Sequence, residues 1–234
     1  MRRLWAVAAI FLAGTACSTS AAVESSGQGA QRNFAVGDFN RVELAGSHDV
    51  RVTVGGAPSV RAEGDPADLD RLEIKVENGR LRIGSKRGSW TSHGKVTVYV
   101  TAPNLQAVDV AGSGNMEVAP LRTGEFRGEV AGSGNLTLQG LESDAARFDI
   151  AGSGNVRAAG RTRALRIEVA GSGNGKLADL QAETAEISIA GSGNAEVRAS
   201  GTAAIDLVGS GNVGVTGGAR CSVSKMGSGE VRCG

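Results

Sequence analysis

The pentapeptide Ala151-Gly152-Ser153-Gly154-Asn155 decides the fold, because close copies of it recur through the second half of the chain. The seven copies begin at residues 111, 131, 151, 170, 190, 208 and 226, so successive starts lie 20, 20, 19, 20, 18 and 18 residues apart. A near-constant period is the signature of a stacked-repeat architecture in which each copy is one structural unit. A degenerate copy at 45–49 predicts that a unit of the same type opens the fold.

Short stretches of alternating apolar and polar residues flank the copies, as in Phe148-Asp149-Ile150 before one and Leu136-Thr137-Leu138 after another. Alternation with a period of two is typical of strands that bury one face. The remaining eight or so residues of each unit, such as 119–125, predict a return path. Two strands and a return within one period predict an all-β fold, a right-handed parallel β-helix with coils of about 18–20 residues.

A consecutive antiparallel meander is the alternative topology, because Gly-Ser-Gly-Asn is also suited to closing a hairpin. Vertical stacking is favoured, since it explains why identical turns recur in register. Such coils stack about 4.8 Å apart, as neighbouring strands do in any sheet.

The repeated turn predicts a structural role for its residues. Two glycines around one serine suit a sharp corner that needs backbone angles forbidden to other residues, and asparagine tolerates the left-handed region. In-register coils would align the serines in one column and the asparagines in another, where stacked amides can hydrogen-bond from coil to coil. The turn ladder comprises Ser113, Asn115, Ser133, Asn135, Ser153, Asn155, Ser172, Asn174, Ser192, Asn194, Ser210 and Asn212.

The first residues are typical of a bacterial export signal. Arg2 and Arg3 precede an uncharged apolar stretch, 4–12, that is too short to span a bilayer. The run ending at Cys17 looks like a lipobox, which predicts diacylation of that cysteine and membrane attachment through the lipid, as in outer-membrane lipoproteins. Ordinary cleavage after Ala16 or after 20–22, giving a soluble periplasmic or secreted protein, is the alternative.

The expected organisation is a signal peptide at 1–16, a flexible tether at 17–33, an N-terminal β-rich part at 34–107, and the repeat solenoid with a C-terminal cap at 108–234. The chain has three cysteines, and lipidation of Cys17 leaves Cys221 and Cys233 to form a disulfide in an oxidising compartment. Lys225 falls where earlier copies have an apolar core residue, which predicts that the core ends there.

The composition argues against several classes of protein. Aromatic residues make up 3% of the chain, so the core must be thin and aliphatic, and a net charge of +1 gives no electrostatic case for nucleic-acid binding. The stretch 209–214 spells a dinucleotide fingerprint and 171–176 resembles a phosphate-binding loop, but 215–218 cannot open a helix and Leu177 cannot hold magnesium. No cofactor is predicted.

Outward-facing charges recur with the repeat. The carboxylates Asp109, Glu129, Asp149, Glu168 and Asp206 occupy equivalent positions, and three of them follow an arginine by two residues: Arg127, Arg147 and Arg166. This pattern predicts a solvated, locally neutralised surface in preference to a cation-binding ladder or a pair of catalytic carboxylates. The two histidines, His48 and His93, have neither metal-ligand nor triad spacing, so neither a metal site nor a catalytic residue is predicted.

The chain resembles the bacterial auto-transporter adhesin head GIN domain family over about residues 34–218. The likeness is carried by 69–73, 77–81 and 96–103 together with the Gly-Ser-Gly-Asn series. The resemblance implies an exported β-helical domain, often lipid-anchored, with no defined ligand. We therefore expect a non-enzymatic cell-envelope lipoprotein that binds a glycan or an envelope protein. A structural or stress-related envelope protein without a soluble ligand is the second hypothesis, and a polysaccharide-active β-helix enzyme is the third.

Overall fold

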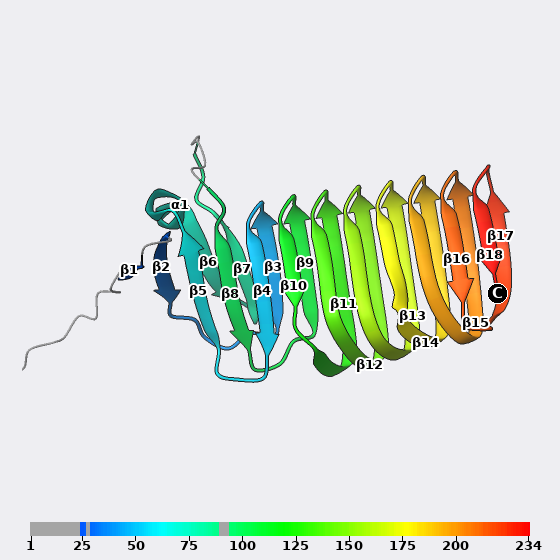
Figure 1. Ribbon diagram of the computed structural model, residues 1–234, viewed down its shortest axis with the longest axis horizontal. Coiled ribbons are helices and arrows are strands. Elements are labelled where there is room, and N and C mark those ends of the chain that lie inside the picture. The colour runs from blue at the N-terminus through cyan, green and yellow to red at the C-terminus, as the bar shows by residue number, and fades with distance from the viewer. Residues whose placement is uncertain (1–23, 27–28, 89–93) are drawn as a thin grey trace, which may run out of the picture.

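The computed structural model describes residues 24–26, 29–88 and 94–234, and it shows a β-solenoid of about six turns (Figure 1). The strands up to the first complete coil are β1 Glu24–Ser26, β2 Gly29–Phe34, β3 Arg41–Gly46, β4 Asp49–Val54, β5 Ser59–Gly64, β6 Leu72–Glu77, β7 Arg80–Ser85, β8 Thr97–Ala102, β9 Ala107–Gly112 and β10 Asn115–Val118. The remaining strands are β11 Leu121–Gly132, β12 Asn135–Gly152, β13 Asn155–Gly171, β14 Asn174–Gly191, β15 Asn194–Gly209, β16 Asn212–Thr216, β17 Arg220–Met226 and β18 Glu230–Cys233. The predicted signal peptide, Cys17 and His93 lie outside the described residues.

Consecutive coils pair as parallel strands, with equivalent residues directly opposite each other. Asn155 lies opposite both Asn135 and Asn174, and the same register continues from β9 and β10 to β17 and β18. The corners between the strands line up along one edge of the molecule (Figure 1). The parallel pairing confirms the predicted β-solenoid and rules out the antiparallel meander for this part of the chain.

The return path is more regular than the sequence predicts. β12 runs as one strand of 18 residues from one corner to the next, and β11 already begins at Leu121, inside the predicted return. Leu141 and Leu180 are buried at this bend, so the return has apolar residues to anchor it. Irregularities in register, such as that between Leu138 and Leu141, let the strand turn without leaving the sheet.

The N-terminal part continues the stack, in a different chain order. β3 and β4 form the coil predicted from 45–49 and pair with β9 and β10, although 66 residues separate the partners in sequence. On their other side lie β7 and β8 in parallel pairing, and beyond these β6 and β5 pair antiparallel. β2 adds to β5, so strand structure begins within the segment 17–33 for which a tether is predicted.

Two local features of the N-terminal part follow directly from its sequence. Helix α1, Pro66–Arg71, is capped at its N-terminus by Asp65, whose carboxylate accepts a hydrogen bond of 2.8 Å from the Ala67 N–H. The turn between β6 and β7 has Asn78 and Gly79 in the left-handed region, as a tight two-residue hairpin requires. The antiparallel strands β2, β5 and β6 cap the N-terminal end of the solenoid together with α1 (Figure 1).

The core consists of columns of apolar side chains, and each coil contributes one side chain to each column. Ile150 and Val169 belong to one column, and Phe148, the bulkiest fully buried side chain among the described residues, belongs to its neighbour. Gly128 lies opposite Phe148 in the preceding coil, and a Cβ at Gly128 would lie 2.9 Å from the Phe148 ring. Gly128 therefore leaves the space that the Phe148 ring fills, as close packing of the core requires.

The two glycines of each corner serve different needs. Gly152 has a φ of +117°, and its equivalents in the other coils are also positive, whereas Gly154 has an ordinary φ. At Gly154 the constraint is close approach, because a Cβ would lie 2.5 Å from Val130 Cγ1 of the preceding coil. The left-handed role predicted for the asparagines is wrong, since Asn78 is the one non-glycine residue with positive φ in the described part.

Candidate functional site

The asparagine row is a continuous chain of side-chain amides along the corner edge. Asn115 Nδ2 donates to Asp49 Oδ1 at 2.7 Å, and each later amide donates to the amide of the coil before it at 2.8–2.9 Å. The ladder ends where Asn212 Oδ1 accepts the backbone N–H of Glu230. Because each internal amide both donates and accepts, the row holds neighbouring coils in register.

The serine row lies beside it and faces solvent. The side chains of Ser113, Ser133, Ser153, Ser172, Ser192 and Ser210 are all exposed. Their backbone N–H groups donate to a glycine carbonyl of the preceding coil at 2.8–3.1 Å. The serines therefore contribute backbone hydrogen bonds to the corner and leave a line of exposed hydroxyls.

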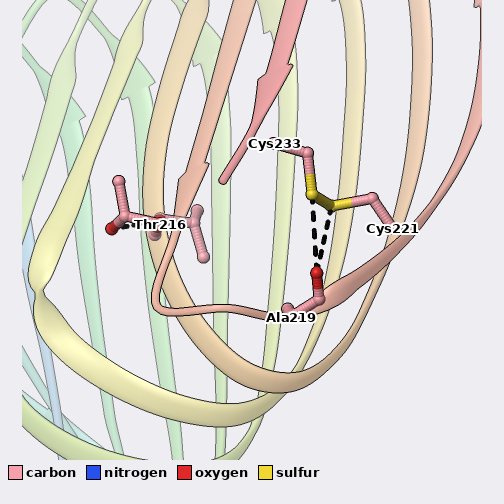
Figure 2. The surroundings of a disulfide bond; sticks show 5 residues. Thr216, Ala219, Cys221 and Cys233 are labelled. Atoms are coloured by element: carbon pink, nitrogen blue, oxygen red, sulfur yellow. Dashed lines mark hydrogen bonds between the residues drawn. A yellow bond between two sulfur atoms is a disulfide. The ribbon is translucent and has the colours of Figure 1, made fainter.

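The disulfide between Cys221 and Cys233 joins β17 to β18, with Cα atoms 6.6 Å apart, beside the Ala219 carbonyl (Figure 2). It cross-links the two strands of the last coil. Lys225 lies opposite Leu207, as predicted, but its side chain is exposed and its ammonium group donates to the Gly229 carbonyl at 2.9 Å. The apolar columns therefore stop at this coil.

A groove of about 1270 Å³ follows the solenoid axis on one face. It crosses seven adjacent parallel strands in the order β7, β3, β9, β11, β12, β13 and β14. At about 4.8 Å per strand, the groove is roughly 29 Å long. Small side chains line part of it, including Ala107, Ala145, Ala164 and Thr184. We call this feature the axial groove.

Two rows of charged residues accompany the axial groove. The first is an arginine row, with Arg80, Arg41, Arg127, Arg147 and Arg166 at equivalent positions and Ala107 interrupting it after Arg41. The second, two residues further along each strand, is a carboxylate row made of Glu43, Asp109, Glu129, Asp149 and Glu168. Both rows follow from the repeat, because equivalent outward positions in successive coils lie opposite each other.

Ion pairs connect the arginine row to the carboxylate row, both within a coil and between neighbouring coils. The Arg147 guanidinium lies 3.0 Å from Asp149 of its own coil and 3.1 Å from Glu168 of the next. Arg166 repeats the pattern with Glu168 at 2.6 Å and Glu186 at 2.7 Å. The surface is locally neutralised here, as the sequence predicts, and most of these carboxylates already have a cationic partner.

Asp109 departs from this pattern. Its coil has Ala107 at the arginine position, and within the described part of the chain the Asp109 carboxylate forms no hydrogen bond and no ion pair within 4.0 Å. The Arg41 guanidinium, which lies next to Ala107 in the arginine row, also forms no hydrogen bond and no ion pair with the described residues. The equivalent diagonal pair, Arg127 with Asp149, is closed at 2.9 Å. Asp109 and Arg41 both line the axial groove, so an unoccupied acceptor and an unoccupied donor face it.

Burial raises the pKa of the Asp109 carboxyl above its ordinary value of 3.8, because desolvation disfavours the ionised form. The charges of Arg80 and Arg127 oppose this shift, while Glu129 and Glu43 reinforce it. Since the pKa is higher in the folded state than in the unfolded state, the ionised carboxylate lowers stability. This penalty disappears as the pH falls through the raised pKa to below 3.8. Sequence reasoning missed Asp109 because it grouped this residue with its paired equivalents; the alanine two residues earlier was the available signal.

His48 lies in the corner of the β3–β4 coil, with its Nε2 atom 3.0 Å from Ser85 Oγ. Burial lowers the pKa of His48, against the raising effects of Asp68 and Asp49, so the neutral ring is favoured. The His48 carbonyl accepts the Asn115 N–H as a corner glycine does elsewhere. We interpret the pair as a polar filling of the first corner. In the described part of the chain, no group of three potential ligands could hold a metal ion.

Comparison with known proteins agrees with this architecture. The family model described as "Putative auto-transporter adhesin, head GIN domain" matches residues 38–219. A structure described as a putative adhesin from Bacteroides fragilis NCTC 9343 is 21% identical, with a TM-score of 0.80, covering 88% of this chain and 97% of that one. A structure described as a putative adhesin from Parabacteroides merdae ATCC 43184 is 19% identical, with a TM-score of 0.71 and coverage of 91% and 100%. These two likenesses show the fold.

A third structure, described as a putative lipid binding protein from Parabacteroides distasonis ATCC 8503, is 26% identical with a TM-score of 0.70, covering 88% of this chain and 96% of that one. No curated protein matches the chain. Helix α1 is too short to cross a bilayer, and the described residues contain no other helix. The family match extends from the N-terminal β3–β4 coil to the start of the last coil, and on that ground the chain belongs to the auto-transporter adhesin head GIN domain family.

Proposed function

We propose that this protein is a non-enzymatic, exported binding protein of the bacterial cell envelope, and that the axial groove is its binding surface. The observation that carries the proposal is the groove itself, which crosses seven strands and presents the side chains of Arg41 and Asp109 without partners among the described residues. An extended partner lying along the axis would contact many coils at once, so weak contacts would add up. The family label and the adhesin descriptions of the structural relatives support a role at the cell surface.

The N-terminal sequence supplies the second part of the proposal, attachment of the protein through Cys17 to the outer membrane, facing the periplasm or the exterior. Mass spectrometry of the processed N-terminus tests it, with a diacylglyceryl cysteine as the expected first residue. The Cys17→Ser variant should leave the membrane fraction and become soluble. An unmodified N-terminus beginning elsewhere in the wild type would contradict the anchor and leave the groove proposal intact.

Lipid is a weaker candidate for the groove, despite the description of the Parabacteroides distasonis relative. An acyl chain would need an apolar channel, whereas charged residues line this groove at almost every coil. A purely structural envelope role is the second candidate function. The ion pairs around Arg147 and Arg166 favour it, because each of these two arginines is already bound by two carboxylates.

A binding assay with matched variants separates these functions. Fluorescently labelled protein is added to intact Gram-negative cells and to isolated envelope fractions, and bound protein is counted. Ala164→Trp, at an exposed position in the groove, should reduce binding about tenfold by filling the space. Glu196→Trp, at an exposed position outside the groove lining, is the control and should bind normally. No binding by the wild type would favour the structural role, and equal binding by both variants would place the binding surface outside the groove.

A further inference from the structure

The charge on the axial groove restricts the chemistry of its ligand. The lining contains five arginines (Arg41, Arg80, Arg127, Arg147 and Arg166) and five carboxylates (Glu43, Asp109, Glu125, Glu129 and Glu186), so it is neutral overall. Three of these arginines are already bound by carboxylates on two sides. A polyanion would have to displace those pairs, and an extended polycation would meet the arginines. The groove is therefore suited to an uncharged, polar ligand.

The backbone geometry argues against a peptide. The groove crosses the outer face of a sheet whose strands are hydrogen-bonded on both sides, from β3 through β14, so it offers no free strand edge for a peptide to join. An extended peptide also repeats every 3.3 Å or so, whereas the coils repeat about every 4.8 Å. A polymer whose repeating unit is close to the coil spacing would meet the same contacts at each step, and a linear glycan has a unit of about that size.

The gap at Ala107 supplies the specific contacts. A sugar presents hydroxyl groups that both donate and accept, so it can satisfy a carboxylate and a guanidinium at the same time. Asp109 and Arg41 occupy the diagonal positions that Asp149 and Arg127 occupy two coils further on, but they remain apart. Ala107, which lies opposite Arg41 and two residues before Asp109, gives this coil no arginine of its own to bind the carboxylate, so both charged groups remain available to a ligand.

We infer that the axial groove binds an uncharged linear glycan along the solenoid axis, with Asp109 accepting and Arg41 donating hydrogen bonds to its hydroxyl groups. The inference deepens the proposed function and rests on it. Small side chains at Ala145, Ala164 and Thr184 let the sugar rings approach the sheet. Phe126, the aromatic residue that lines the groove, is buried, so the affinity depends on hydrogen bonds and on the number of sugars held.

Isothermal titration of the purified protein with defined oligosaccharides tests the ligand class. The probes are cellohexaose, mannohexaose and chitohexaose, with hexagalacturonate as the anionic counterpart. At least one uncharged hexamer should bind, more tightly than its trimer, and its affinity should change less than about twofold between roughly 50 and 500 mM NaCl, because no net charge is neutralised. Binding of hexagalacturonate alone, with steep salt dependence, would overturn the inference, and so would no binding of any uncharged hexamer at millimolar concentration.

Paired variants test the two residues. Asp109→Asn and Arg41→Gln should each weaken binding of the uncharged hexamer about tenfold, the loss of one hydrogen bond to a charged group. Asp206→Asn, in the same carboxylate row but outside the groove, and Arg157→Gln, exposed and outside the groove lining, should bind as the wild type does. Equal effects of test and control variants would overturn the assignment of Asp109 and Arg41.

The two levels of the proposal fail in different ways. If labelled protein binds envelope fractions through the groove, but protease treatment of the fractions abolishes binding, the proposed function stands and the glycan inference falls. If the Ala164→Trp variant binds envelope fractions as well as the wild type does, the groove is not the binding surface and both fall together.

Discussion

Replacing Gly152 by alanine tests the stacked corner in the middle of the solenoid. Gly152 has a φ of +117°, where an L-amino acid with a side chain is strained, and a Cβ there would lie 2.6 Å from the Gly132 carbonyl oxygen of the preceding coil. The variant must therefore adopt an unfavourable backbone angle and push two coils apart at the same point.

The magnitude follows from these two effects. The backbone strain costs roughly 1–2 kcal/mol, and the steric overlap with a neighbouring backbone costs about 1–3 kcal/mol. Together they should lower the free energy of unfolding by about 2–5 kcal/mol, a large part of the roughly 5–15 kcal/mol that stabilises a typical domain.

Urea denaturation followed by far-ultraviolet circular dichroism measures the loss, with hydrogen exchange to locate it. Gly214→Ala is the matched control, because a Cβ at Gly214 would have no atom within 4 Å and the residue has an ordinary φ. The control should be neutral or stabilised by up to about 1 kcal/mol. If Gly152→Ala unfolds at the same urea concentration as Gly214→Ala, equivalent corners are not stacked as described.

Three further predictions concern stability. Asp109→Asn should raise the free energy of unfolding at pH 7, because burial raises the pKa of the carboxyl, and this gain should vanish below about pH 3.8 in urea titrations at several pH values; an unchanged stability at pH 7 would contradict it. Asn155→Ala removes two ladder hydrogen bonds and should cost about 2 kcal/mol in the same assay, against less than about 0.5 for Ser153→Ala; similar losses would refute the ladder. Reducing Cys221–Cys233 should destabilise the last coil by up to about 3 kcal/mol and accelerate amide exchange there, with β12 unaffected; uniform acceleration would argue against a local role.

The repeat made the solenoid predictable, because each copy carries its own strand pattern and corner. Ile150 and Asn155 could be assigned to the core and the edge from parity and period alone, and the structure places them there. The return path was less predictable. Leu141 and Leu180 sit among polar residues, and only the stacked coils show that these leucines are buried together at the bend.

The N-terminal part exposed another limit of sequence reasoning. The degenerate corner at 45–49 predicts a coil, but nothing in the sequence shows that β9 would pair with β3 across the intervening β5–β8 segment. Such pairing depends on long-range contacts, which local patterns do not encode. β2, which begins within the predicted tether, was missed for a related reason, since its antiparallel pairing with β5 forms only at the end of the stack.

The two charged rows of the candidate site were predictable from the sequence, but the unpaired state of Asp109 was not. The period gives the carboxylate row and the paired arginines, and hence a neutral surface. The unpaired state of Asp109 depends on Ala107 and on the position of Arg41, which comes from a coil more than 60 residues earlier in the chain. The groove needs the folded coils, because its lining is drawn from seven strands.

A crystal structure of the protein soaked with the tightest-binding uncharged hexasaccharide tests the binding proposal most directly. Continuous sugar density should lie along the axial groove, with hydroxyl groups within hydrogen-bond distance of Asp109 and Arg41. Sugar density confined to the serine edge or to the ends of the solenoid, with the groove holding only water, would contradict it.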